Sequence, residues 1–131
     1  MRALKKKRKI LCLDDEPLVL PIYKHVLESH GYDVLTAQSS TEALEIMLRE
    51  PIGLLIQDLA RPHMDGIELY RVMKSDERLR CIPVVICSGS EWWRNRFLGQ
   101  CLGAEAVLAK PFDVALALGV IRKTLQAGAA E

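Results

Sequence analysis

The sequence contains no long hydrophobic run, and this absence excludes two classes of protein. No apolar segment approaches the roughly 18 residues that a membrane-spanning helix needs. The amino-terminal residues also lead into no apolar segment long enough to be the core of a secretory signal peptide. We therefore expect a cytoplasmic protein with no membrane partner.

Neither sign of charge is in excess. Lys and Arg together number 18, Asp and Glu number 17, and the formal net charge at pH 7 is +1. Proteins that bind nucleic acid through a broad basic face carry a larger positive excess, so we expect no direct nucleic-acid binding. The one dense basic run, residues 5–9, falls mostly within residues 1–8, which we interpret as a solvated leader. The alternative, a nucleic-acid contact, predicts salt-dependent binding that is lost when this run is deleted.

Cysteine pairs with metal-binding spacing are also absent. Cys12, Cys81, Cys87 and Cys101 form no CxxC motif and have no histidine nearby at the intervals typical of zinc sites. Cys12 and Cys87 lie in apolar runs, where a free cysteine behaves as a small hydrophobic side chain. This usage is typical of a reducing compartment and predicts neither a redox nor a metal role.

Short apolar runs alternate with amphipathic segments along the whole chain. Half of the 131 residues are hydrophobic, which is enough to give one domain its own core. Each apolar run is expected to be a strand, and the runs are residues 10–13, 34–37, 54–56, 83–87 and 106–109. Strand–helix alternation repeated five times predicts an α/β fold, a doubly wound parallel sheet with helices on both faces.

The first helical segment is expected at about residues 17–30. Pro17 suits the first helical position, and Gly31 suits the position just past the helix end. Pro21 would then lie inside the helix, where it removes one hydrogen bond and could kink the first turns.

The other helical segments also have recognisable ends. Ser39 and Glu42 predict a capping box at the start of the second helix, which is expected to end at about Arg49. Three further helices are expected: one capped by Asp65, one at about residues 91–102, and one from after Pro111 to about residue 126.

Reactive side chains follow four of the five expected strands. Asp14 and Asp15 come after the first, Asp58 after the third, Ser88 after the fourth and Lys110 after the fifth. The carboxyl ends of parallel strands meet at one edge of the sheet, where folds of this class bind ligands. Clustered carboxylates without His or Cys favour a hard divalent cation, Mg²⁺ or Mn²⁺. Together with a hydroxyl and an ammonium group, this set predicts phosphoryl transfer to a carboxylate.

Four segments, in this order, resemble the receiver domain of bacterial two-component response regulators. They are Asp14-Asp15-Glu16-Pro17, residues 58–66, residues 82–89, and Gly103-Ala104 followed by Lys110-Pro111-Phe112. The resemblance covers about residues 9–125 and implies the flavodoxin-like receiver fold, with five strands in the order 2-1-3-4-5. We therefore expect a receiver domain at residues 9–126, followed by a tail or the start of a linker at residues 127–131.

The resemblance implies roles for the acidic residues of the predicted site. Asp58 matches the phosphoacceptor, and the donor would be a sensor histidine kinase or a phosphotransfer protein. Asp15 and Asp58 match the carboxylate ligands of Mg²⁺. The backbone carbonyl of Ala60 matches a third ligand, and Asp14 would act through a bound water.

The implied activity is that of a phosphorylation-controlled switch and not of an enzyme. Ser88 and Lys110 would each contact a phosphoryl oxygen. The domain would catalyse only its own phosphorylation and dephosphorylation, and the phosphorylated form would present a changed protein-interaction surface.

Two features depart from the usual pattern of receiver domains. Val107 stands where receivers commonly have a Tyr or Phe, which leaves the usual coupling to output in question. Trp92 and Trp93 are adjacent in the helix expected at residues 91–102. One ring could pack on the core while the other lies along the surface. Alternatively, both could anchor a downstream protein or a second copy on the face formed by the fourth helix, fifth strand and fifth helix.

Other functions remain open at this point. The fold could belong to a pseudo-receiver, an interaction module that is not phosphorylated. The acids could also be surface carboxylates that only cap helices. A haloacid-dehalogenase-like Mg²⁺ phosphatase is a third alternative, although Asp14-Asp15-Glu16 fits its motif only loosely and Asp58 has no acid two residues later. Turnover separates the phosphatase from a receiver, because a phosphatase releases many phosphates per protein whereas a receiver is modified about once.

Overall fold

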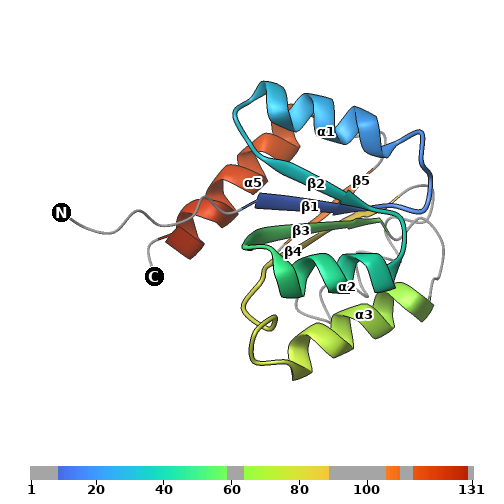
Figure 1. The fold of residues 1–131 in the computed structure, drawn as a ribbon. Coiled ribbons are helices and arrows are strands. Elements are labelled where there is room, and N and C mark those ends of the chain that lie inside the picture. The colour runs from blue at the N-terminus through green and yellow to red at the C-terminus, as the bar shows by residue number, and fades with distance from the viewer. Residues whose placement is uncertain (1–8, 59–63, 89–105, 110–113, 130–131) are drawn as a thin grey trace.

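The computed structural model describes residues 9–58, 64–88, 106–109 and 114–129. For residues 58, 64–67, 88, 106–109, 114–117 and 126–129 it describes only the backbone. Five parallel strands form one sheet in the order β2-β1-β3-β4-β5, which confirms the expected topology (Figure 1). The strands are β1 (Lys9–Leu13), β2 (Val34–Ala37), β3 (Ile52–Asp58), β4 (Val84–Ser88) and β5 (Ala106–Ala109).

The apolar runs predict all five strands, and the differences lie at the strand ends. β3 is longer than its apolar run because it pairs with β1 on one side and with β4 on the other. These ladders include Gln57 and Asp58, which are not apolar. β4 begins at Val84, and the carbonyl of Pro83 accepts a hydrogen bond from the Leu55 N–H at 3.0 Å. Proline has no N–H of its own to donate.

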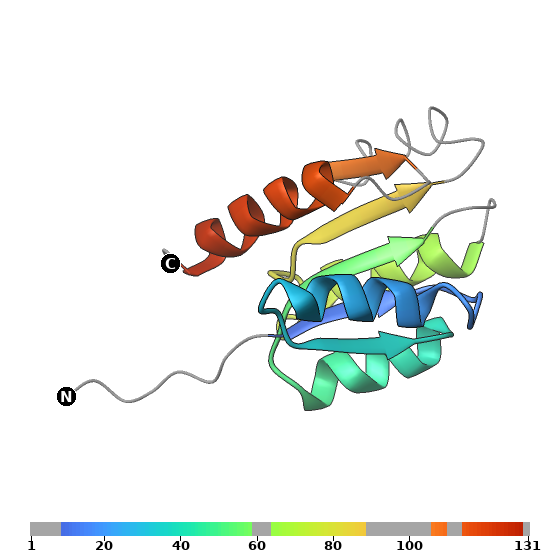
Figure 2. The same cartoon turned by 90° about the horizontal axis from the view of Figure 1, so that it is seen from above.

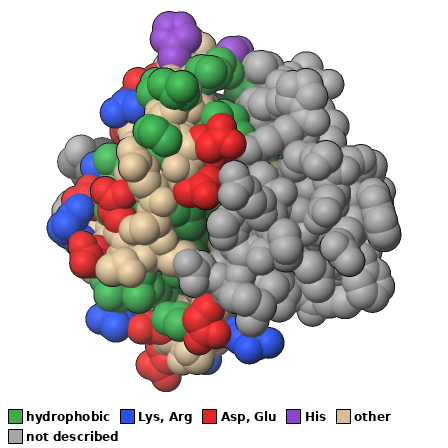
Figure 3. All heavy atoms as spheres, turned by 90° about the vertical axis from the view of Figure 1, so that its right-hand side faces the viewer, with side chains coloured by type: hydrophobic (Ala, Val, Ile, Leu, Met, Phe, Trp, Pro, Cys, Tyr) green, Lys and Arg blue, Asp and Glu red, His purple; other side chains and the backbone are tan. Residues whose placement is uncertain are grey.

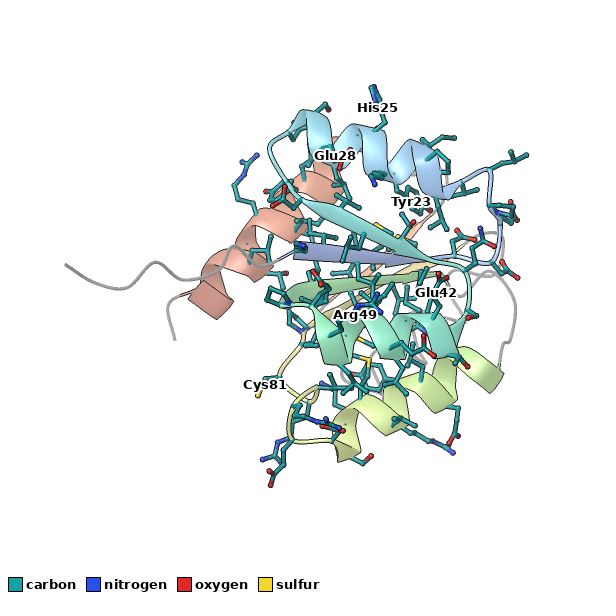
Figure 4. All side chains as sticks on the ribbon, in the orientation of Figure 1. Tyr23, His25, Glu28, Glu42, Arg49 and Cys81 are labelled. Atoms are coloured by element: carbon teal, nitrogen blue, oxygen red, sulfur yellow. The ribbon has the colours of Figure 1, made fainter. Side chains whose placement is uncertain are left out.

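Helices cover both faces of the sheet (Figure 2). They are α1 (Leu20–Ser29), α2 (Ser40–Arg49), α3 (Met64–Ser75) and α5 (Val114–Ala129). The cluster under α1 and α5 contains Tyr23 and Ile121, and the cluster under α2 and α3 contains Ile46 and Met73. Figure 4 shows Tyr23 between α1 and the sheet, whereas His25 on the same helix points away from it. This pattern confirms the doubly wound α/β fold.

The predicted start of the first helix is wrong by three residues. Residues 17–19 form a turn, α1 begins at Leu20, and Pro21 lies in its first turn. The N–H groups of a first helical turn have no partner within the helix, so proline is tolerated there. Pro21 therefore stands at the start of α1 in place of Pro17, and it does not kink the helix interior.

The predicted end of α1 is confirmed. Gly31 has φ +92°, a left-handed conformation that glycine adopts without steric cost. Its N–H donates to the Glu28 carbonyl at 3.0 Å, and the Tyr32 N–H donates to the Leu27 carbonyl at 3.2 Å. This pair of hydrogen bonds is the Schellman arrangement that closes a helix.

The start of α2 is also confirmed. The Ser39 side chain accepts a hydrogen bond from the Glu42 N–H at 3.1 Å, and the Glu42 carboxylate accepts one from the Gln38 N–H at 2.7 Å. The carboxylate thus binds the residue before the N-cap and not the N-cap itself. The first contact satisfies a backbone donor that the helix leaves unpaired, and the second satisfies the N–H of the residue before the N-cap.

The ends of the remaining helices differ from the predictions. Asp65 is not the cap of α3, because the helix begins one residue earlier, at Met64. Acidic residues are favoured both at the cap and in the first turn, so the residue type does not separate the two positions. α5 continues to Ala129, beyond the expected end at residue 126, since alanine is the strongest helix former. The helix expected at residues 91–102 lies outside the described residues.

Two glycines should respond to alanine in opposite ways. Gly31 has a positive φ, so Gly31→Ala should lower the free energy of unfolding by about 1–2 kcal/mol. Gly119 lies within α5, where an added Cβ meets nothing within 4 Å, so Gly119→Ala should raise it by about 0.5–1 kcal/mol. Urea denaturation of both variants measures these changes, and changes of the same sign would contradict the assignment.

Candidate functional site

The strand register brings several of the predicted site residues to one edge of the sheet. Leu13 pairs with Gln57, so Asp14 follows β1 at the level where Asp58 ends β3. Asp58 in turn pairs with Cys87 of β4. The two acids predicted from separate motifs therefore follow neighbouring strands at the same height.

The structure describes only some of the other predicted site residues. Ser88 ends β4 and pairs with Ala109, the last residue of β5. Val107 lies within β5, paired with Ile86. The remaining predicted residues lie outside the described part of the chain: Ala60, Trp92, Trp93 and Lys110.

Asp14 is a buried carboxylate with fixed hydrogen bonds. Its side chain is only 1% exposed. The Asp14 N–H donates to the Ala37 carbonyl at 3.1 Å, and its Oδ1 accepts from the Glu16 N–H at 2.9 Å. Asp15, the next residue, is exposed. One acid is thus held in place while its neighbour reaches solvent, on the end of the molecule that Figure 3 shows with acidic side chains.

The cysteines near this edge are structural. Cys12 and Cys87 are buried and form no disulfide, as predicted. Burial raises the pKa of the Cys12 thiol, and the nearby Cys87 thiol and Asp14 carboxylate raise it further. Cys12 therefore stays protonated and packs as an apolar side chain. Cys81 is free and exposed in the turn before β4 (Figure 4), and Cys101 lies outside the described residues.

Gln57 has no role in the sequence-based prediction, yet it is buried at the same edge. It is 2% exposed and lies directly before Asp58. The apolar run ends at Ile56, so Gln57 reads as the first polar residue after a strand. The side chains of a strand alternate between its two faces, so Gln57 lies on the same buried face as Leu55. This alternation is the signal in the sequence that indicates a buried Gln57.

The donor atoms described at this edge suit a hard cation. Asp14 and Asp15 offer carboxylate oxygens, the ligands that Mg²⁺ prefers. Among the side chains that the structure describes, which do not include that of Asp58, no three His, Cys, Asp or Glu residues form a group that could hold a metal ion. In that same part of the chain, no helix combines the length and the apolar character that crossing a membrane requires.

Comparison with known proteins gives consistent matches over nearly the whole chain. Residues 10–122 match the response regulator receiver domain family. The chain is 32% identical over 106 residues to the alkaline phosphatase synthesis transcriptional regulatory protein PhoP of Bacillus subtilis, covering 81% of this chain and 43% of PhoP. It is 25% identical over 118 residues to the polar-differentiation response regulator DivK of Brucella ovis, covering 90% and 96%.

A solved structure shares the fold closely. The response regulator receiver domain from Clostridium thermocellum superposes with a TM-score of 0.83 at 31% identity, covering 94% of this chain and 98% of that one. The chain spans less than half the length of PhoP and nearly all of DivK. The family match contains all four motif segments and the edge at which β1 and β3 end. This chain belongs to the response regulator receiver domains, the signalling domains of two-component systems.

Proposed function

We propose that Asp58 is the phosphoacceptor of this receiver domain and that a sensor histidine kinase or a phosphotransfer protein is the donor. The observation that carries the proposal is the register, which ends β3 at Asp58 level with the buried Asp14. A carboxylate at the edge of an apolar sheet, next to other acids, is suited to bind a cation and accept a phosphoryl group.

Asp58 acts as the nucleophile in this proposal. One of its carboxylate oxygens forms a bond to phosphorus while the phosphorus–nitrogen bond to the donor imidazole breaks. The imidazole leaves as the neutral ring after taking up one proton. Later, water breaks the new phosphorus–oxygen bond, which releases inorganic phosphate and restores the carboxylate. The domain thus turns over only its own phosphoryl group.

Asp15, Asp58 and the carbonyl of Ala60 would hold Mg²⁺, with Asp14 acting through a water molecule. When bound, the ion neutralises negative charge on the phosphoryl oxygens. Asp15 is exposed to solvent, and the hydrogen bond that Asp14 Oδ1 accepts from the Glu16 N–H orients the Asp14 carboxylate. Mn²⁺ has the same preference for oxygen ligands and can substitute.

The phosphoryl oxygens would be bound by two further side chains of the site. Ser88 would donate a hydrogen bond to one oxygen, and Lys110 would form an ion pair with another. The position of Ser88 at the end of β4, next to the strand that carries Asp58, supports this role.

The output of the switch would be a protein contact. We assign it to the face formed by residues 91–102, β5 and α5, with Trp92 and Trp93 as contacts to a downstream protein or to a second copy. Val107 would transmit the change without the aromatic side chain that receivers commonly use. The free thiols are compatible with a cytoplasmic location.

Phosphorylation in vitro tests this function directly. The purified chain, incubated with phosphoramidate and Mg²⁺, should gain the mass of one phosphoryl group, and removing the metal with EDTA should prevent the gain. Borohydride reduces an aspartyl phosphate to homoserine, so peptide mapping should locate the product at residue 58.

Two other outcomes would overturn the assignment. No mass gain with phosphoramidate or with other small phosphodonors would identify a pseudo-receiver. Rapid multiple turnover of p-nitrophenyl phosphate, a phosphate monoester, would identify a phosphatase.

A further inference from the structure

Gln57 is a buried amide whose described neighbours on this face of the sheet are apolar. Its partners across the ladder are Leu13 on β1 and Ile86 on β4, both buried. Leu55, two residues earlier on β3, is also buried in the cluster that contains Leu13 and Ile86. Among the residues that the structure describes, Asp14 and Gln57 are the buried polar or charged ones. Both lie at the edge of the sheet where β1 and β3 end.

Packing alone does not explain an amide at this position. A buried amide must keep its donors and its acceptor oxygen hydrogen-bonded, and leaving them unsatisfied is costly. Methionine has nearly the same volume and carries no such requirement. An apolar residue would therefore fill the space between Leu13 and Ile86 at lower cost, so the polar group indicates a role other than filling the core.

The position of Gln57 connects it to the site. Asp58 follows it directly, and α3 begins at Met64 on the same face of the sheet, where Leu69 and Met73 share the cluster of Leu55. A glutamine amide has two donors and an acceptor oxygen, which can bind backbone groups near the end of a strand.

Asp14 is a second buried polar side chain near this edge, one residue past the end of the neighbouring strand β1. It is buried at the end of β1, and its Oδ1 accepts a hydrogen bond from the Glu16 N–H at 2.9 Å. A side chain at the strand end thus fixes the turn that follows β1. Gln57 is level with Leu13, one residue before the position of β3 that is level with Asp14, so the two buried polar side chains lie at successive levels of neighbouring strands.

We propose that Gln57 is a positioning residue for the phosphoacceptor site: its buried amide fixes the end of β3 and so orients Asp58 for Mg²⁺ binding and phosphoryl transfer. The inference rests on the function proposed above. Residues that orient metal ligands without touching the metal change its affinity or the activity about 10- to 100-fold when they are replaced. We expect an effect of that size for Gln57.

The test compares Gln57→Met with Leu55→Met. Both variants place methionine on the same face of β3, but only the first removes a polar group. Two quantities are measured: the rise in melting temperature with MgCl₂, which reports Mg²⁺ affinity without any phosphodonor, and the rate of phosphorylation by phosphoramidate at saturating Mg²⁺. Gln57→Met should weaken Mg²⁺ binding or slow phosphorylation by about 10-fold or more, whereas Leu55→Met should leave both unchanged.

A purely structural role makes a different prediction. Gln57→Met would then shift the melting temperature in the absence of metal and leave both Mg²⁺ affinity and phosphorylation rate as in the wild type, and that result would overturn the inference. If Gln57→Met does not fold, Gln57→Leu provides the same comparison with a residue type common on this face. If the wild type accepts no phosphoryl group, the proposed function fails and the inference fails with it.

Discussion

Asp58→Asn is expected to abolish phosphorylation of the chain while the fold is retained. An amide oxygen cannot form the acyl phosphate that the carboxylate forms, so no product accumulates at this position. The substitution preserves shape, and the backbone of residue 58 stays paired with Cys87. Intact mass after incubation with phosphoramidate and Mg²⁺ should show one added phosphoryl group for the wild type and none for the variant.

Asp33→Asn is the matched control for this experiment. Asp33 is an exposed acid just before β2, so the same chemical change there should leave phosphorylation unaffected. Thermal unfolding of both variants verifies that they fold. If Asp58→Asn were phosphorylated as fast as the wild type, another carboxylate would be the acceptor, and Asp14 and Asp15 at the same edge would be the first to examine.

The fold could be predicted because each strand coincides with a local apolar run in the sequence. Residues 34–37 and 106–109 became β2 and β5 with the predicted bounds. The apolar runs do not indicate which strands pair with one another, and for this reason the length of β3 differs from the prediction. Hydrogen bonds to β1 and β4 extend this strand to Asp58, beyond its apolar residues. Tertiary contacts thus determine strand ends that local composition leaves open.

The start of α1 could not be predicted for a different reason. Pro17 and Pro21 both suit a first helical turn, and choosing between them depends on where the turn after Asp14 ends. That turn uses the Asp14 side chain, which accepts a hydrogen bond from the Glu16 N–H. A side chain that we propose for the site therefore also contacts the segment that precedes the helix.

The acids of the site were predictable because parallel strands end at the same edge. Their environments were not. Asp14 and Asp15 are adjacent and identical in type, yet one is 1% exposed and the other lies at the surface. In the sequence Gln57 follows the apolar run and looks like the start of a loop, whereas in the structure β3 extends past it and Gln57 lies in the core. Burial depends on the complete packing of the sheet and not on residue type.

Asp14→Asn should stabilise the metal-free protein and impair phosphorylation. The Asp14 carboxylate is buried, and its charge contributes to the raised pKa of the Cys12 thiol. Asparagine removes this charge but keeps an oxygen that can accept the Glu16 N–H. The free energy of unfolding without Mg²⁺ should rise by about 0.5–2 kcal/mol, as is common when a functional site is relieved of a costly group. Phosphorylation should slow about 10- to 100-fold.

Higher stability together with slower phosphorylation in Asp14→Asn would distinguish a functional carboxylate from a structural one. A carboxylate that only stabilised the turn after β1 would lose stability on substitution and leave phosphorylation unchanged. One that is retained for cation binding does the reverse, because neighbouring carboxylates repel one another in the metal-free site and a bound cation offsets that repulsion. Urea denaturation with and without MgCl₂ measures both, and Mg²⁺ should stabilise the wild type more than Asp14→Asn. A variant that is less stable without metal and is phosphorylated at the wild-type rate would assign Asp14 to the fold alone.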